Sequence, residues 1–77
     1  MTITGQQVKA ARDLLEWSQG ELAARSRMGI LMIAEFEAGA LELSEGAIIH
    51  LRWALQSAGV EFANDGEPGV KLRKGKS

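Results

Sequence analysis

Cysteine and tyrosine are absent from this chain of 77 residues, and proline occurs only once. Without cysteine there is no disulfide and no thiolate metal site, which fits a reducing compartment, so we expect a cytoplasmic protein. No apolar run approaches the ~18 residues that a membrane-spanning helix needs, and the first residues lack the basic start of a signal peptide. The chain is expected to be one small domain, with a core drawn from the 45% of residues that are apolar.

Groupings of catalytic residues are also missing. The only histidine, His50, has no second base, nucleophile or cluster of metal ligands near it in the sequence. Asp13, Glu16 and Glu45 are typical of carboxylates on helix surfaces, and no glycine motif that cradles phosphate is present. We therefore expect no enzyme, no catalytic or metal-binding residue and no cofactor.

Positive charge is absent from residues 28 to 51, which contain no lysine or arginine. This segment combines an apolar run, Ile30 to Ile33, with four acids: Glu35, Glu37, Glu42 and Glu45. Four of the nine lysines and arginines lie in the last seven residues, which leaves five in residues 1 to 70 against ten acids, a net charge of −5 there. The body of the domain is therefore acidic, which disfavours nucleic acid, and its C-terminal end is basic.

Capping residues and helical spacing predict four helices. The first begins at Thr4, where Gln7 completes a capping box, and the second begins at Ser18, where Glu21 does the same. Gly29 precedes the third helix and the fourth begins after Ser44. The predicted ranges are about 5 to 17, 19 to 26, 30 to 38, and 45 to 58.

A hairpin is predicted beyond Gly59. Apolar and polar residues alternate on both sides of a turn-rich loop at 64 to 69, and the apolar members are Val60, Phe62, Val70 and Leu72. We therefore expect a mainly α fold, a four-helix domain over residues 1 to 73 with a short C-terminal β-hairpin. Residues 74 to 77 are expected to form a basic, flexible tail.

Two short motifs make the chain resemble the Cro/C1-type (XRE-type) helix-turn-helix family. They are Ser18-Gln19-x-x-Leu22-Ala23 in the second helix and Glu37-x-Gly39 at the end of the third. Segments 54 to 62 and 68 to 73 resemble a small-protein branch of that family, so the resemblance covers about residues 5 to 73. It implies a helix-turn-helix domain whose third helix would enter the major groove of DNA.

The resemblance also implies roles for individual residues. Arg12 and Glu37 match a pair that joins the first and third helices by an ion pair. Met28, Ile33 and Phe36 match core positions that seat the third helix.

The exposed face of the third helix departs from the family pattern. DNA-binding members are rich there in Ser, Thr, Gln, Asn, Arg and Lys, whereas this chain has Gly29, Ile30, Leu31, Met32 and Glu35. Since consecutive helical positions lie ~100° apart, at least one or two of the three large apolar residues must be exposed. Contiguous apolar patches on a small domain mark protein contacts. The predicted protein-binding residues are Ile30, Leu31, Met32, Glu35, Leu41 and Leu43.

This surface predicts a transcriptional regulator that binds a protein partner. The chain is similar to small antiactivators of quorum-sensing and conjugative-transfer systems, which implies a transcriptional activator as the partner and weak or absent DNA binding. The alternative is a sequence-specific DNA-binding repressor, with Gln19, Arg25 and Arg27 as contacts to phosphate. Two further alternatives stay open, since the third helix could be rotated to bury its apolar run, or that run could form a homodimer contact.

Two tryptophans and one strand edge also bear on oligomeric state. Trp17 and Trp53 are expected in the core or in a dimer contact. The edge of the strand from Val60 to Phe62 offers a second route to a homodimer.

Overall fold

The helices begin where the capping residues predict. The Thr4 hydroxyl accepts from the backbone N–H of Gln7 at 3.1 Å, and the Gln7 side chain accepts from the backbone N–H of Thr4 at 2.9 Å, which completes a capping box. The Ser18 hydroxyl accepts from the backbone N–H of Glu21 at 3.0 Å. The Glu21 carboxylate, however, accepts from Arg25 Nε at 2.7 Å. The capping box expected at Ser18 is therefore wrong in its second half, because an arginine one turn away takes the carboxylate.

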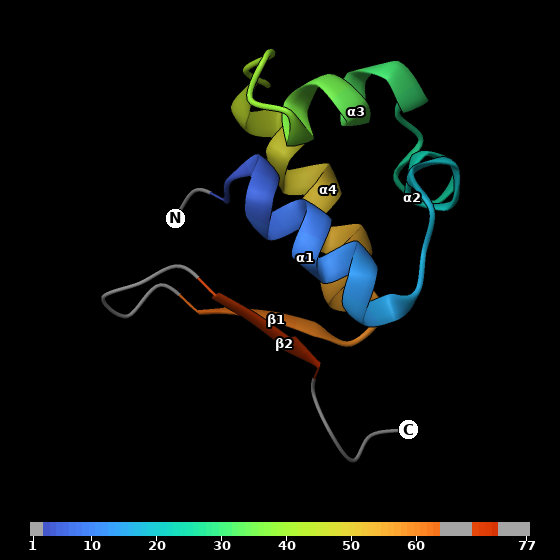
Figure 1. Cartoon of the computed structure of the whole chain (residues 1–77), viewed down its shortest axis with the longest axis vertical. Helices are drawn as coiled ribbons and strands as arrows, with labels where there is room; N and C mark the ends of the chain where they lie inside the picture. Colours follow the sequence, from blue (N-terminus) through green and yellow to red (C-terminus); the bar gives the residue numbers. More distant parts are fainter. Residues whose placement is uncertain (1–2, 64–68, 73–77) are drawn as a thin grey trace.

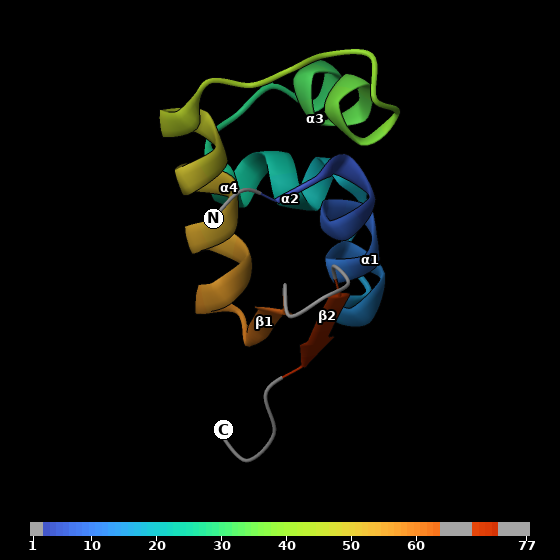
Figure 2. The same ribbon diagram turned by 90° about the vertical axis from the view of Figure 1, so that its left-hand side faces the viewer.

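The computed structural model describes residues 3–63 and 69–72, which form four helices and a two-stranded antiparallel sheet. Their bounds are α1 Gly5–Leu15, α2 Gln19–Ser26, α3 Ile30–Glu37, α4 Glu45–Ser57, β1 Val60–Ala63 and β2 Gly69–Leu72. The ribbon places α3 at one end of the molecule and the hairpin at the other, with α1, α2 and α4 between them (Figure 1, Figure 2). The expected mainly α fold with a C-terminal hairpin is confirmed.

The first helix ends earlier than the sequence predicts. It was expected to reach about Trp17, but it ends at Leu15, and Glu16 takes a left-handed conformation with φ of 60°. The backbone N–H of Trp17 donates to the Arg12 carbonyl at 2.9 Å, and the Arg12 guanidinium donates to the Trp17 carbonyl at 2.8 Å. Arg12 therefore holds the chain as it leaves the helix and turns toward α2.

The core draws on all four helices and the first strand. Its members are apolar and buried: Ile3, Val8, Ala11, Leu22, Ile33, Phe36, Leu51, Ala54, Leu55 and Val60. Trp17, Met28, Leu43 and Val70 pack against this cluster while partly buried. The inner residues of α3 therefore join the same core as α1 and α4.

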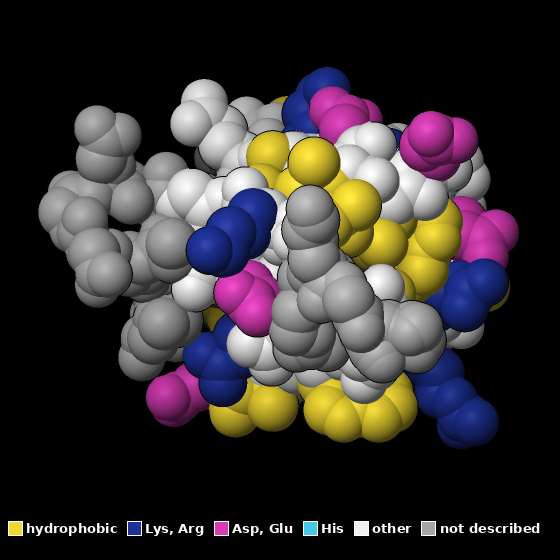
Figure 3. All heavy atoms as spheres, turned by 90° about the horizontal axis from the view of Figure 1, so that it is seen from below, with side chains coloured by type: hydrophobic (Ala, Val, Ile, Leu, Met, Phe, Trp, Pro, Cys, Tyr) yellow, Lys and Arg dark blue, Asp and Glu magenta, His cyan; other side chains and the backbone are white. Residues whose placement is uncertain are grey.

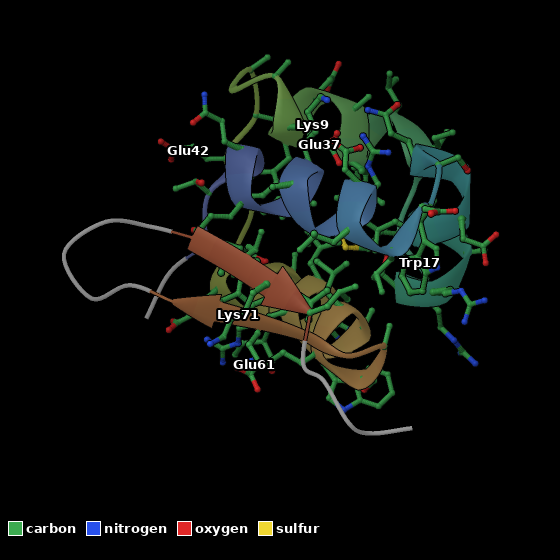
Figure 4. All side chains as sticks on the ribbon, turned by 60° about the horizontal axis from the view of Figure 1, so that its bottom comes forward. Lys9, Trp17, Glu37, Glu42, Glu61 and Lys71 are labelled. Carbon is green, nitrogen blue, oxygen red and sulfur yellow. The ribbon has the colours of Figure 1, made fainter. Side chains whose placement is uncertain are left out.

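The hairpin closes the core opposite α3. Val60 pairs with Leu72 and Phe62 with Val70, so the hairpin expected from the alternating pattern is present. Glu61 lies opposite Lys71, and both side chains lie on the outer side of the sheet (Figure 4). Residues 64–68 of the expected loop and the expected tail at 74–77 lie outside the described residues. Within the described part of the chain, no helix is long and apolar enough to cross a membrane.

Gly5 sets how closely α1 approaches α3. A Cβ atom at this position would lie 2.1 Å from the Phe36 carbonyl oxygen and 2.8 Å from the Glu37 Cα atom. Because both are backbone atoms, α3 itself would have to move. Gly5→Ala is therefore expected to lower the free energy of unfolding by about 1–3 kcal/mol, measured by urea denaturation.

Gly46, near the start of α4, provides the matched control for this prediction. A Cβ atom there would meet no atom of the other described residues within 4 Å outside its own stretch of helix. Gly46→Ala should therefore stabilise the protein by up to about 1 kcal/mol through helix propensity. Equal changes in the free energy of unfolding at the two positions would show that the close approach of α1 to α3 does not contribute to stability.

Candidate functional site

The first turn of α3 exposes three consecutive large apolar side chains. Ile30 is 54% exposed, Leu31 67% and Met32 40%. We call these three residues the α3 patch. Ile33 and Phe36, on the same helix, are buried in the core. The alternative in which α3 rotates to bury the apolar run is therefore wrong.

The position of α3 follows from the spacing of its inner residues. Ile33 and Phe36 lie one turn apart, so they share the face that packs on the core. Gly29 precedes the helix and provides no side-chain cap. The aliphatic residues of the first turn therefore lie on the outer side, next to an N-terminus whose backbone N–H groups have no side-chain partner there.

The remaining predicted residues differ in how far they are exposed. Glu35 is exposed, while Leu41 and Leu43 are half-buried. Leu43 lies in the segment between α3 and α4, and its side chain also packs against the core. The structure therefore brings Ile30, Leu31 and Met32 together with Glu35, and it turns Leu43 partly inward.

A buried ion pair fixes the other end of α3. Arg12 Nε donates to Glu37 Oε2 at 2.8 Å and Arg12 Nη2 donates to Oε1 at 2.9 Å, with only 10% and 4% of the two side chains exposed. Figure 4 shows Glu37 where α3 meets α1. The hydrogen bond to Glu37 raises the pKa of Arg12, against the effect of burial, and the charge of Glu37 raises it further. The pair that the family resemblance implied between α1 and α3 is present.

Two of the three residues expected to contact phosphate are engaged within the domain. Gln19 Nε2 donates to Glu37 Oε1 at 3.1 Å. The Arg25 guanidinium lies 4.6 Å from the centre of the Trp17 ring, and its Nε donates to Glu21. Arg27 is exposed, and it makes no ion pair with any described residue. A DNA-binding role for this side of the domain would therefore depend mainly on Arg27.

A second exposed apolar surface lies on α4, where the sequence analysis considered only Trp53, as a core or dimer-contact residue. Trp53 is 65% exposed and Ile49 is 50% exposed. Of the two placements expected for Trp53, the core is therefore wrong, and a dimer contact stays a prediction. Leu51 and Leu55 take the inner face of α4, and Ile49 and Trp53 share the opposite face at the same four-residue spacing. The second pair of apolar residues at four-residue spacing, on the face opposite Leu51 and Leu55, is the sequence signal from which this surface could have been predicted. On the face seen in Figure 3, hydrophobic side chains reach the surface in several patches, with Lys and Arg side chains near them.

A scan against models of protein families matches none of them, and a search of curated proteins finds no significant match. Among residues 3–63 and 69–72, no three His, Asp or Glu side chains gather in a group that could hold a metal ion. The function must therefore be argued from the exposed surfaces.

Proposed function

We propose that this chain is a helix-turn-helix regulator of the Cro/C1 type that acts by binding a protein partner through the α3 patch. One observation carries the proposal. The first turn of α3 presents Ile30, Leu31 and Met32 at 40–67% exposure, within a segment from 28 to 51 that has no lysine or arginine. Exposed apolar side chains that adjoin one another favour burial against another protein.

The chemistry of this surface opposes DNA as the ligand. Attraction between cations and phosphate supplies most of non-specific DNA affinity, and Arg, Lys, Asn and Gln read base edges. The α3 patch offers neither kind of group. Glu35 on α3, Glu42 in the segment after it and Glu45 at the start of α4 are exposed, and they would repel phosphate.

The same acids suggest what the partner looks like. A surface with an apolar centre and an acidic fringe complements a groove that is apolar inside and basic at its rim. The DNA-binding surface of a transcriptional activator is basic by necessity. We therefore favour an antiactivator role in the cytoplasm, in which this protein covers an activator and prevents it from acting.

A direct repressor is the second candidate. The resemblance of α2 and the end of α3 to DNA-binding members of the family favours it, as does the exposed Arg27. Such a repressor would read thymine methyl groups with its apolar side chains and would depend on a few cations for affinity.

A fluorescence anisotropy titration against a labelled random-sequence duplex at low salt separates the two candidates. A DNA reader should bind non-specifically with a dissociation constant of roughly 10⁻⁴ to 10⁻⁶ M, weakening steeply as salt rises. We expect no binding in that range. The matched control is the double variant Leu31→Lys, Glu35→Lys, which should acquire salt-dependent binding. Salt-dependent binding by the unaltered protein would contradict the proposal.

A photocrosslinking amino acid at position 31 tests the protein-binding role directly in producing cells. We expect a protein adduct from position 31 that mass spectrometry identifies as a transcriptional activator. The control carries the same amino acid at the exposed Ala24 of α2 and should give no such adduct. Purified complex should lose at least about tenfold in affinity with Leu31→Glu, as expected for a residue at the centre of a contact. The same adducts from both positions would contradict the α3 patch as the site.

A further inference from the structure

A groove runs between α2 and α4, and we call it the α2–α4 groove. Its middle is a cavity of about 450 Å³ lined by Arg25, Ser26, Arg27, Ile49, His50 and Trp53. A cavity of about 320 Å³ shares Arg25 and Trp53 with it and extends to Ala58. Another, of about 290 Å³, shares Arg27 and His50 and extends to Met32. The three adjoin one another, so the groove follows most of the length of α4.

The floor of this groove is apolar and open to solvent. Ile49 and Trp53 lie one turn apart on α4 and are 50% and 65% exposed. Trp17 lines the far end together with Ala54 and Ala58. An indole exposed to this degree beside another apolar side chain is a typical anchor of a protein contact.

The edge of the groove on the α2 side is positively charged. Arg25 and Arg27 both line the middle cavity, and among the described residues no Asp or Glu lines any of the three cavities. Glu21 pairs with Arg25 and offsets part of that charge. Arg27 makes no ion pair with the described residues, so its charge is available to a ligand. The groove is thus a basic site on a domain whose first 70 residues carry a net charge of −5.

We propose that the α2–α4 groove binds an acidic amphipathic helix of a partner protein. The apolar face of that helix would cover Ile49 and Trp53. Its carboxylates would accept hydrogen bonds mainly from Arg27, since Arg25 Nε already donates to Glu21. Charge-assisted bonds of this kind fix the register of a helix, while the aromatic anchor supplies most of the affinity.

Charge argues against occupants from this chain itself. A two-fold contact centred on the groove would bring Arg25 and Arg27 of both copies into one interface, where like charges repel. The C-terminal end of the chain holds four cations in its last seven residues, so the groove repels it too. An acidic, amphipathic segment of another protein can cover the apolar floor and also pair with the positive charge at the edge.

This inference goes beyond the α3 patch, because it concerns a different surface and the opposite charge. Met32 lies at the end of the groove and also belongs to the α3 patch. A partner could therefore contact both surfaces at once. Separate variants distinguish the two, since Leu31 lines none of the cavities of the groove.

A pair of labelled peptides tests the proposal on the full-length protein by anisotropy. Both contain about 14 residues, enough to span the ~20 Å of α4, with leucines along one helical face. One peptide has glutamates on the remaining faces and the other has lysines. We expect the acidic peptide to bind and the basic peptide to bind at least about tenfold more weakly.

Protein variants then locate the binding site. Trp53→Ala and Arg27→Glu should each weaken binding of the acidic peptide by about tenfold or more, whereas Leu31→Glu should leave it unchanged. Trp53 and Arg27 are both exposed, so far-UV circular dichroism should show the variants folded. Amide NMR shifts on α2 and α4 should move on titration.

Three peptide-binding results would overturn the proposal. They are equal binding of the two peptides, no binding of the acidic peptide, or binding that Trp53→Ala does not weaken. Sedimentation that shows a dimer converted to a monomer by Trp53→Ala would assign the groove to a second copy instead. None of these results alters the crosslinking expected from position 31, so this inference and the function proposed for the α3 patch can fail independently.

Discussion

Arg12→Ala is expected to lower the free energy of unfolding by about 3–5 kcal/mol, as when one member of a buried ion pair is removed. The substitution would leave the Glu37 carboxylate 4% exposed with Gln19 as its remaining donor. It would also remove the donor to the Trp17 carbonyl. The total free energy of unfolding of a small domain is only about 5–15 kcal/mol. Urea denaturation followed by circular dichroism should therefore show a large fall in the urea concentration at the unfolding midpoint.

The double variant Arg12→Met, Glu37→Leu is the control for this prediction. Replacing both members of a buried pair by apolar residues of similar size is often close to neutral. The double variant should therefore recover most of the stability that Arg12→Ala loses. A loss below about 1 kcal/mol in Arg12→Ala, which is typical of an exposed pair, would show that the contact between α1 and α3 is weak.

Ile33→Ala is expected to lower the free energy of unfolding by about 2–5 kcal/mol, the range for truncation of a buried aliphatic side chain. Leu31→Ala, two residues earlier on the same helix, should change stability by less than about 0.5 kcal/mol. Ile33 has no exposed surface, whereas Leu31 is 67% exposed. Urea denaturation of the two variants therefore measures which face of α3 is buried.

The contrast between the two variants matters more than either value. Similar costs at positions 31 and 33 would mean that α3 is rotated and that the α3 patch belongs to the core. The protein-binding proposal would then lose the observation that carries it. If Ile33→Ala does not fold, Ile33→Val provides a milder truncation with an expected cost of about 0.5–1.5 kcal/mol.

Local signals in the sequence predicted the elements well because their causes are local. The hydroxyl groups of Thr4, Ser18 and Ser44 cap the helices that follow them. Gly39 and Gly59 take positive φ values past helix ends, as their positions suggest. The exposure of the α3 patch also follows from helical geometry, since three consecutive side chains cannot share one face.

Features that depend on packing between elements were not predicted in the same way. A left-handed Glu16 ends α1 at Leu15, and the Arg12 guanidinium binds the Trp17 carbonyl just beyond that end. No spacing in the sequence encodes this contact. The ion pair of Arg12 with Glu37 was expected only from the family resemblance. The α2–α4 groove requires the end of α2 to approach α4, so neither helix alone could reveal that Arg27 and Trp53 line one cavity.

The contacts that hold α3 in place leave exposed positions in its first turn that can tolerate substitution. Gly5 meets the helix at Phe36, Arg12 holds it at Glu37, and Ile33 anchors its inner face, so each of these contacts lies on the inner side or at the C-terminal end. Leu31, the most exposed of the three at 67%, contributes the least burial to the fold, whereas Ile30 and Met32 are 54% and 40% exposed. Substitution at position 31 can therefore alter partner choice with little loss of stability. The domain would then act as a scaffold in which exposed side chains in the first turn of α3 vary while the core residues stay constant.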